Sequence, residues 1–423
     1  MVKLKRVKSV ALVCALALGL SACSSSGSDS GKELSGELNL FLIPSPSSTS
    51  IQSFIPEFTA KTGVKVNVSE TPYGEAHQKQ LLSYKQKAGA YDIAQFDNSF
   101  LAPFCQAKAM TAIDKWVNDS AEYDINDFSK GQQDYGKCAN GETFGLTLST
   151  EPMIQWYRTD IYQELGLTPA KTWDEYFNNA KKVQAAGYGG QIIGFGPNVS
   201  WWWMTMVWSF GGKLYDDSLN PAVNSKEAIA ATDFLKKLMT VSPKGASTAN
   251  SDEVTSKFLG ENIGAMINYS GYYGSVLDPS INKNEGKIGT APMPTGSADI
   301  THLAGWNIGI PKDAKNPTAA WKFLEYVLGK TNAKAYLESG AAAIGRKSIT
   351  TDADLLAKFP YLAQLEIPAS SRIERYPQLA VWPEFEVAAI DAVTQVLNGK
   401  SDSTKAMTAL NEKLKPILAK EPK

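Results

Sequence analysis

The sequence predicts an α/β protein of two lobes, and three observations carry this prediction. Its 423 residues exceed the ~250–300 residues that a single hydrophobic core usually serves. Residues 36–96 follow the order strand, helix, strand, helix, strand with short connectors, which is typical of a parallel sheet covered by helices. A second strand and helix pattern begins after residue 148. Each lobe is therefore expected to contain a mainly parallel sheet flanked by helices.

The first lobe opens with three predicted strands and two predicted helices. Strands are expected over 36–42, 64–68 and 92–96, and helices over 51–61 and 75–87. Ligands of such sheets bind beyond the carboxyl ends of the strands. The loops 44–49 and 97–100 are therefore where a binding site is expected.

The second lobe begins with a helix whose start is marked by a capping box. Thr172 is expected to accept a hydrogen bond from the third amide of the helix, while Glu175 bonds back, and the helix runs to Ala186. Ser225 caps another predicted helix. Further strands are expected over 191–195, 262–269, 287–292 and 306–310, and apolar residues at helical spacing mark two helices near the C-terminus (Ile390, Val393 and Leu397; Met407, Leu410, Leu414 and Ile417).

The N-terminus has the pattern of an export signal. Four basic residues precede an apolar run over 10–20, which is too short to span the ~30 Å core of a bilayer. The run ends at Leu20-Ser21-Ala22-Cys23, which resembles a bacterial lipobox. We expect a signal peptide over 1–22, a lipid on Cys23, and a flexible Ser/Gly tether over 23–35. An ordinary secretory signal with a chance cysteine is the alternative.

These features predict a lipid-anchored protein on the extracytoplasmic face of a bacterial cell membrane. The long tether favours the surface of a single-membrane cell over a periplasm. Cys14 leaves with the signal and Cys23 takes the lipid, so Cys105 and Cys138 remain of the four cysteines. Exported proteins meet an oxidising compartment, so these two are expected to form a disulfide. Two free thiols are the alternative.

Composition excludes several classes of function. The formal charge is −1 and becomes more negative without the signal, and no basic stripe remains to bind nucleic acid. With two histidines and no HExxH or CxxC motif, neither a metal site nor a cofactor is expected. No nucleophile elbow surrounds any serine. Paired acids such as Glu384 and Glu386 leave a glycosidase open, although such pairs are common on solvated helices.

Three consecutive tryptophans, Trp201 to Trp203, suggest a sugar-binding surface. On a helix they would cover about 200° of its circumference, and on a strand they would alternate faces. Neither geometry buries all three rings in one core, so at least one ring is expected to line a cleft. Pyranose rings offer apolar faces to aromatic side chains and hydroxyl groups to carboxylates.

Several segments give the chain a family resemblance from residue 36 to the end. They are residues 141–160 (GETFGLTLSTEPMIQWYRTD), 171–175 (KTWDE), 264–273 (GAMINYSGYY), 302–310 (HLAGWNIGI) and 316–326 (NPTAAWKFLEY). Together they resemble the family-1 extracellular solute-binding proteins of bacterial ABC importers. Ser45-Pro46-Ser47-Ser48 departs from the family's maltose-binding members, which have a charged pair there, so maltose specificity is in doubt.

The resemblance implies a two-lobed, type II-like periplasmic-binding-protein fold whose lobes are joined by hinge crossings. The first lobe would contain residues 36–148 and 300–350, and the second 151–298 and 355–423. A carbohydrate would bind between them, and the monomeric protein would deliver it to the permease subunits. The candidate ligand-binding residues are Asp97, Glu151, Trp201, Tyr272, Trp306, Trp382 and Phe96, with Ser45 and Trp202 beside them.

Other functions stay open at this stage. One is an anchored glycan hydrolase or lyase, which would need two carboxylates across a cleft. Another is a binder of a different solute, such as a polyamine or an organic anion. A purely structural surface lipoprotein is the third.

Overall fold

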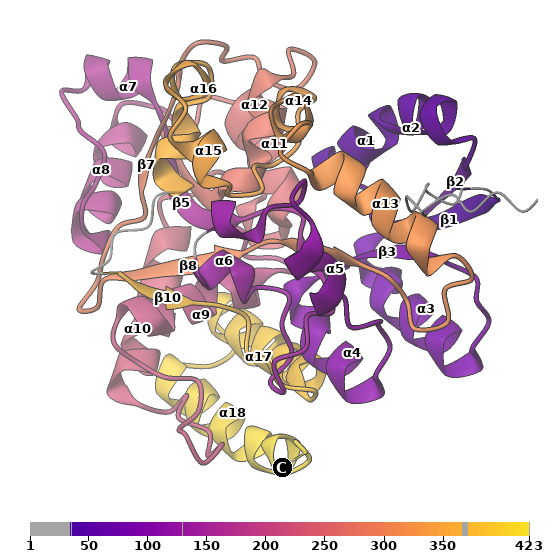
Figure 1. Ribbon diagram of the computed structural model, residues 1–423. Helices are drawn as coiled ribbons and strands as arrows, with labels where there is room; N and C mark the ends of the chain where they lie inside the picture. Colours follow the sequence, from indigo (N-terminus) through magenta and orange to yellow (C-terminus); the bar gives the residue numbers. More distant parts are fainter. Residues whose placement is uncertain (1–33, 35, 129, 366–370, 423) are drawn as a thin grey trace, which may run out of the picture.

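The computed structural model describes residues 34, 36–128, 130–365 and 371–422. It shows two mixed sheets, each flanked by helices, and confirms the α/β class and the two-lobed architecture (Figure 1). The predicted signal peptide, the lipid site Cys23 and the tether apart from Leu34 lie outside the described residues. No helix of the described residues is both long enough and apolar enough to cross a membrane.

The first lobe is built on a five-stranded sheet of order β2-β1-β3-β9-β4. Strands β1 (Glu37–Leu42), β2 (Lys65–Glu70) and β3 (Ile93–Asp97) are parallel, as expected. Strand β9 (Trp306–Gly309) runs antiparallel to both β3 and β4 (Leu146–Thr147). The helices that accompany this sheet are α1 (Pro46–Ser53), α2 (Ile55–Thr62), α3 (Tyr73–Gln86), α4 (Leu101–Ala107), α5 (Asp114–Asp119), α6 (Lys130–Gln133), α13 (Pro317–Leu328) and α14 (Ala333–Glu338). Helices α15 (Lys347–Thr350) and α16 (Ala353–Lys358) contact the short helix η5 (Pro360–Leu365), which packs on the sheet of the second lobe.

The second lobe has a sheet that is mostly antiparallel, contrary to the expected mainly parallel one. Strand β5 (Glu151–Arg158) pairs antiparallel with β6 (Ala265–Tyr269), β7 (Ile288–Pro292) and β8 (Ile300–Ala304), and only β10 (Arg372–Glu374) is parallel to β8. Eight helices cover it: α7 (Thr159–Glu164), α8 (Trp173–Ala185), α9 (Val199–Ser209), α10 (Lys226–Met239), α11 (Ser251–Gly260), α12 (Tyr273–Leu277), α17 (Trp382–Leu397) and α18 (Ser403–Leu418).

Each lobe has its own apolar core. In the first, the Phe58 ring of α2 meets the Phe323 ring of α13 edge to face at 5.0 Å, which brings the late helix α13 back onto the early sheet. In the second, Trp202 and Trp203 of α9 are fully buried. Burying a large apolar side chain contributes roughly 1.5–3 kcal/mol, so these contacts hold each lobe together independently.

Two of the three crossings of the chain between the lobes lie at neighbouring points. Residues 148–150 connect β4 to β5, and Gly305 alone separates β8 from β9. A Cβ at Gly305 would overlap the carbonyl oxygen of Ser149, and its φ of +151° also favours glycine. The two crossings therefore lie against each other.

Several expectations about local structure need correction. Strand β8 pairs within the second sheet, although residues 300–304 were assigned to the first lobe. The expected strand over 191–195 is wrong, because only an isolated bridge joins Ile192 to Met266. Further along this segment, Gly194 lies so close to the Trp202 ring that a Cβ there would overlap it.

Two helix starts also differ from the expectation. The expected 44–49 loop is largely α1, which begins at Pro46 with the Ser45 hydroxyl accepting from the Ser48 amide at 3.1 Å. Proline at the first helical position favours this early start. At α8, Thr172 caps the Glu175 amide as expected, but the Glu175 carboxylate accepts from Lys171 instead of Thr172.

Candidate functional site

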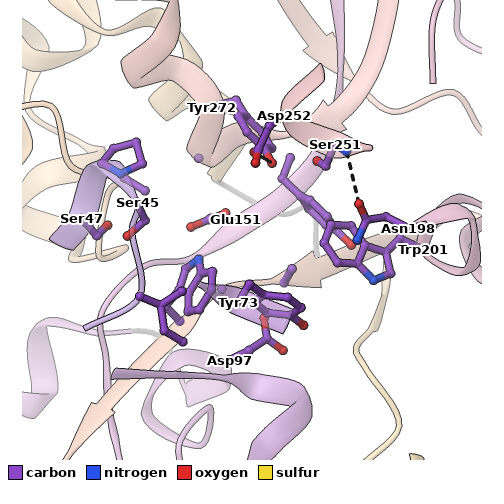
Figure 2. Close-up of a pocket in the computed structure, with 18 of the residues that line it drawn as sticks. Ser45, Ser47, Tyr73, Asp97, Glu151, Asn198, Trp201, Ser251, Asp252 and Tyr272 are labelled. Carbon is purple, nitrogen blue, oxygen red and sulfur yellow. Dashed lines mark hydrogen bonds between the residues drawn. The ribbon is translucent and has the colours of Figure 1, made fainter. Parts of the chain in front are cut away.

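A cavity of about 340 Å³ lies between the two lobes (Figure 2). The first lobe contributes the 43–47 segment, Tyr73, Asp97 and Trp306 to its wall, and the second contributes its other side. The residues of the second side include Glu151, Asn198, Trp201, Ser251, Asp252, Tyr269, Tyr272 and Tyr376. The structure therefore brings together six of the nine residues expected from the sequence: Ser45, Asp97, Glu151, Trp201, Tyr272 and Trp306.

Glu151 enters the cavity from the first residue of β5, directly after a crossing between the lobes. One carboxylate oxygen accepts a hydrogen bond from the Ser149 hydroxyl at 2.5 Å. A Cβ at Gly271 would overlap the Glu151 carboxyl group, so glycine is needed there for the close approach. Burial, with a smaller contribution from the charge of Asp97, raises the pKa of Glu151 to about 7, although the Ser149 hydrogen bond lowers it.

Asp97 ends β3 and points into the same cavity. Its carboxylate accepts from the Ser99 amide at 2.7 Å and so caps the short 3-10 helix η1 (Asn98–Phe100). The side chain therefore both caps a helix and lines the cavity. Burial raises its pKa to about 6 despite the Ser99 hydrogen bonds, which lower it.

Trp201 stands on α9 and is held by an acid that the sequence analysis did not select. Its ring N–H donates to Glu386 Oε1 at 3.2 Å, and the Ser200 hydroxyl donates to the same oxygen at 2.8 Å. Burial raises the pKa of Glu386 to about 7, and Asp97 adds to the shift. The sequence contains a feature that could have identified Glu386: this acid interrupts the apolar stripe of Trp382, Ala389 and Val393 on α17.

Aromatic rings form much of the remaining wall. Tyr73 of the first lobe meets Trp201 of the second edge to face at 6.4 Å, and it also contacts Trp306 at 5.9 Å. The hydroxyls of Tyr269 and Tyr376 lie 3.3 Å apart. Tyr73 begins α3, which follows the carboxyl end of β2, so the strand-end rule applied to the other loops would have found it.

Three of the expected residues lie in the cores and not in the cavity. Phe96 is fully buried against Phe104 because side chains alternate along β3 and its neighbour Asp97 faces the cleft. Trp202 is turned about 100° around α9 from Trp201 and donates to the Ile267 carbonyl at 2.8 Å. Trp382 packs face to face on Phe385 within α17 and is 1% exposed.

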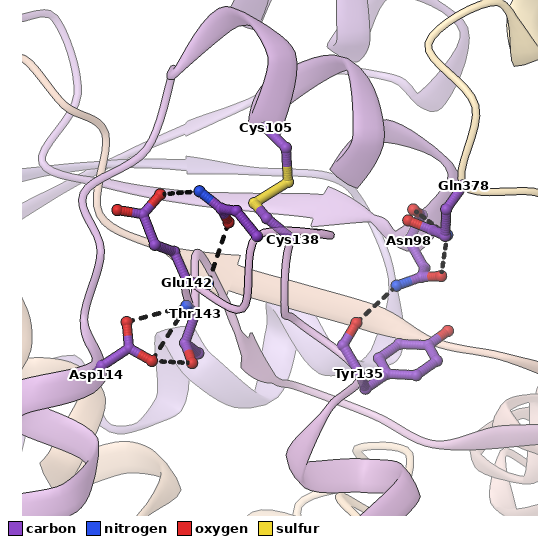
Figure 3. Close-up of a disulfide and its surroundings, with 9 residues drawn as sticks. Asn98, Cys105, Asp114, Tyr135, Cys138, Glu142, Thr143 and Gln378 are labelled. Atoms are coloured by element: carbon purple, nitrogen blue, oxygen red, sulfur yellow. Dashed lines mark hydrogen bonds between the residues drawn. A yellow bond between two sulfur atoms is a disulfide. The ribbon is translucent and has the colours of Figure 1, made fainter. Parts of the chain in front are cut away.

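The expected disulfide between Cys105 and Cys138 is present and joins α4 to the 134–143 segment (Figure 3). On the neighbouring side of this segment, Asn98 donates to the Tyr135 carbonyl at 2.9 Å. Gln378, from the second lobe, donates to the Asn98 amide oxygen at 2.9 Å. The disulfide-linked segment thus supports a hydrogen bond between the lobes beside the cavity.

The site has the chemistry of a binding cavity. Carboxylates accept hydrogen bonds from hydroxyl groups, and aromatic faces cover apolar surface. Within the described residues, no group of three His, Cys, Asp or Glu side chains is arranged to hold a metal ion. Neither histidine lines the cavity, and burial lowers the pKa of His302 to about 3.

Comparisons with known proteins agree with this geometry. A probable amino-acid ABC transporter periplasmic-binding protein of Sinorhizobium fredii is 25% identical over 374 residues, covering 86% of this chain and 84% of that protein. The arabinooligosaccharide-binding protein of Bacillus subtilis is 23% identical over 333 residues, covering 75% of each chain. An ABC transporter solute-binding protein of Agrobacterium radiobacter, solved with ribitol, superposes with a TM-score of 0.82 at 25% identity and covers 90% of this chain and 98% of its own.

The family profile described as bacterial extracellular solute-binding protein matches residues 44–334, which is more than half of the chain. The profile describes binding proteins, so the sequence-based conclusion that the chain is not an enzyme is confirmed. One assignment follows from the profile match. The cavity between the two lobes and the residues that bear the resemblance agree with it. The chain belongs to the bacterial extracellular solute-binding protein family.

Proposed function

We propose that this protein captures a carbohydrate between its lobes and delivers it to an ABC permease. The observation that carries the proposal is a cavity in which carboxylates and aromatic rings from both lobes face the same space. Asp97 and Glu151 would accept from ligand hydroxyls, while Trp201 and Tyr73 would cover its apolar faces. The relatives that bind arabinooligosaccharide and ribitol support the same ligand class.

The dimensions of the cavity favour a small ligand. Its volume of about 340 Å³ lies near the lower end of the ~300–1,000 Å³ of small-molecule sites. A single sugar ring or a short polyol suits this space better than a long oligosaccharide. A free amino acid is disfavoured, because its carboxylate would find no lysine or arginine among the described residues that line the cavity.

Capture by lobe closure follows from the position of the wall residues. A ligand that contacts Trp306 on one lobe and Trp201 on the other stabilises the closed state by its differential affinity for that state. The closed form would dock on the permease as a monomer, and no bond of the ligand would break. A lipid on Cys23 would keep the protein at the extracytoplasmic face of the membrane.

A thermal-shift screen tests the ligand class, because a ligand that binds only the folded state raises the melting temperature. The screen includes sugars, polyols, amino acids and polyamines, and calorimetry follows each positive result. We expect a sugar or polyol to bind and to be recovered intact. Stabilisation by an amino acid, with no response to any sugar or polyol, would refute the proposal. Mass measurement of Cys23→Ala beside the natural protein tests the lipid.

A further inference from the structure

The cavity gathers negative charge without a matching base. Asp97, Glu151 and Asp252 line it, and Glu386 stands directly behind Trp201. No lysine, arginine or histidine is among the described residues that line the cavity. Asp97 raises the pKa of both Glu151 and Glu386, so three of these carboxyl groups form one electrostatic cluster.

The basic groups outside the wall are not among the causes that shift the pKa of these carboxyl groups. Both histidines are held uncharged by burial, with the pKa of His77 lowered to about 4 and that of His302 to about 3. Arg375 contacts the Tyr135 ring at 5.2 Å, and neither residue lines the cavity. Among the causes that shift the pKa of Asp97, Glu151 or Glu386, none is a positive charge.

Aromatic side chains surround the same space. Tyr73, Trp201, Tyr269, Tyr272, Trp306 and Tyr376 all line it. An aromatic ring attracts a cation over its face, and aromatic cages bind ammonium groups in this way. Hydroxyl and amide groups of Ser45, Ser47, Asn198 and Ser251 lie in the wall as well.

From these features we infer that the ligand is a carbohydrate bearing a protonated amine, namely an amino sugar or an aminopolyol. This inference rests on the proposed function and narrows its ligand class. The ammonium group would lie between Asp97 and Glu151 under the aromatic rings, and the hydroxyl groups would meet the serine and asparagine side chains. The ligand would supply the positive charge that the wall lacks.

The test compares ligands that differ only in charge. Calorimetry at pH 7.5 measures D-glucamine against D-sorbitol, with corresponding pairs of other polyols and of sugars whose amine is fully protonated at this pH. A hydrogen bond to a charged group is worth roughly 1.5–3 kcal/mol, so we expect the preferred amine to bind about tenfold or more tightly than its neutral partner.

Variants separate charge from shape. Glu151→Gln and Asp97→Asn keep the size of each side chain and remove its charge, so each should reduce the amine preference about tenfold or more while affecting the neutral partner less. Asp391→Asn, on an exposed part of α17, is the matched control and should leave the preference unchanged. The melting temperatures of all three variants are measured to check that the fold is kept.

The pH dependence gives an independent readout. D-glucamine carries a primary aliphatic amine, as lysine does, and stays protonated throughout the neutral range. Asp97, Glu151 and Glu386 lose their protons between about pH 5 and 8, because their pKa values are raised to about 6, 7 and 7. Affinity for D-glucamine should therefore rise over this interval in the natural protein and rise less in Glu151→Gln.

The possible outcomes distinguish this inference from the proposed function. If sugars or polyols bind and no amine of the set binds more tightly than its neutral partner, the amine inference is wrong and the carbohydrate proposal stands. If only polyamines without hydroxyl groups bind, or nothing in the set binds, both are wrong. An amine preference that survives both charge-removing variants would also overturn the inference.

Discussion

Trp201 and Glu386 are joined by a hydrogen bond of 3.2 Å from the indole N–H to the carboxylate, between α9 and α17. This bond fixes the orientation of a ring that forms part of the cavity wall. Ser200 donates to the same oxygen, so Glu386 restrains two consecutive residues of α9. A ring of the cavity wall is thus positioned by a residue that does not line the cavity.

Trp201→Ala should weaken ligand binding by about 1–3 kcal/mol, because it removes a stacking surface and its burial. Glu386→Ala should weaken binding less, by releasing the ring, and Glu386→Gln should retain most of the affinity because its amide oxygen still accepts. Calorimetry with the ligand found by screening measures all three. Equal affinity of Trp201→Ala and the natural protein would remove Trp201 from the site.

Gly271→Ala should reduce ligand affinity without unfolding the protein. The new methyl group would overlap the Glu151 carboxyl and push it from its place in the cavity. Gly260→Ala is the matched control, because nothing lies within 4 Å of a Cβ at that position on α11. Affinity and melting temperature are measured for both, and unchanged affinity in Gly271→Ala would show that the position of Glu151 does not matter.

Gln378→Ala should favour the open form, because it removes the hydrogen bond to Asn98 across the lobes. A hydrogen bond of this kind is worth roughly 0.5–1.5 kcal/mol, so affinity should fall by about two- to tenfold. Solution X-ray scattering of the ligand-free protein should show a larger radius of gyration. The exposed Gln395→Ala serves as control, and identical scattering of the two variants would argue against a closure contact.

Replacing both Cys105 and Cys138 by serine should lower the free energy of unfolding by about 3–4 kcal/mol, from the entropy of a loop with a sequence separation of 33. Urea denaturation with and without reductant measures the change. Mass measurement after alkylation checks the natural protein, where two alkylated thiols would contradict the disulfide.

Glu151 should make the empty protein less stable as pH rises. Its pKa is about 7 in the folded state against an ordinary 4.5, so the folded state retains a proton that unfolding releases between these values. Its stabilising contribution is therefore complete below pH 4.5 and is lost as pH rises to 7. Glu151→Gln should therefore raise the free energy of unfolding at pH 8 and change it little at pH 4.5. We expect a gain of only about 1–2 kcal/mol, because Glu151 faces the cavity and its charge is partly screened there. An equal gain at both pH values would contradict the shifted pKa.

Patterns local in the chain predicted much of the fold. The alternating strands and the helices of the first lobe follow from spacing that a few residues define, and the Cys105–Cys138 pair follows from export. The antiparallel pairing of β5 does not follow from local patterns, because it depends on which distant segments pair. The periodicity of a strand carries no information about its partners.

The site was also predictable only where it depends on patterns local in the chain. Asp97 and Tyr73 follow strands, so their place at the sheet edge can be derived. That Trp201 and not Trp202 faces the cavity depends on the rotation of α9 against β6, where Trp202 finds the Ile267 carbonyl. Glu386 could have been found only if an acid within the apolar stripe of α17 had been interpreted as functional and not as solvent-exposed.

Glu151 and Trp306 directly follow Thr150 and Gly305 at two of the chain crossings, which we propose as the pivot of lobe closure. A body that swings about a pivot moves least at the pivot itself, so the separation of these two side chains should hardly depend on how widely the lobes stand apart. An arriving solute would find this corner of the site ready-made in the open protein, and only the outer wall would have to travel.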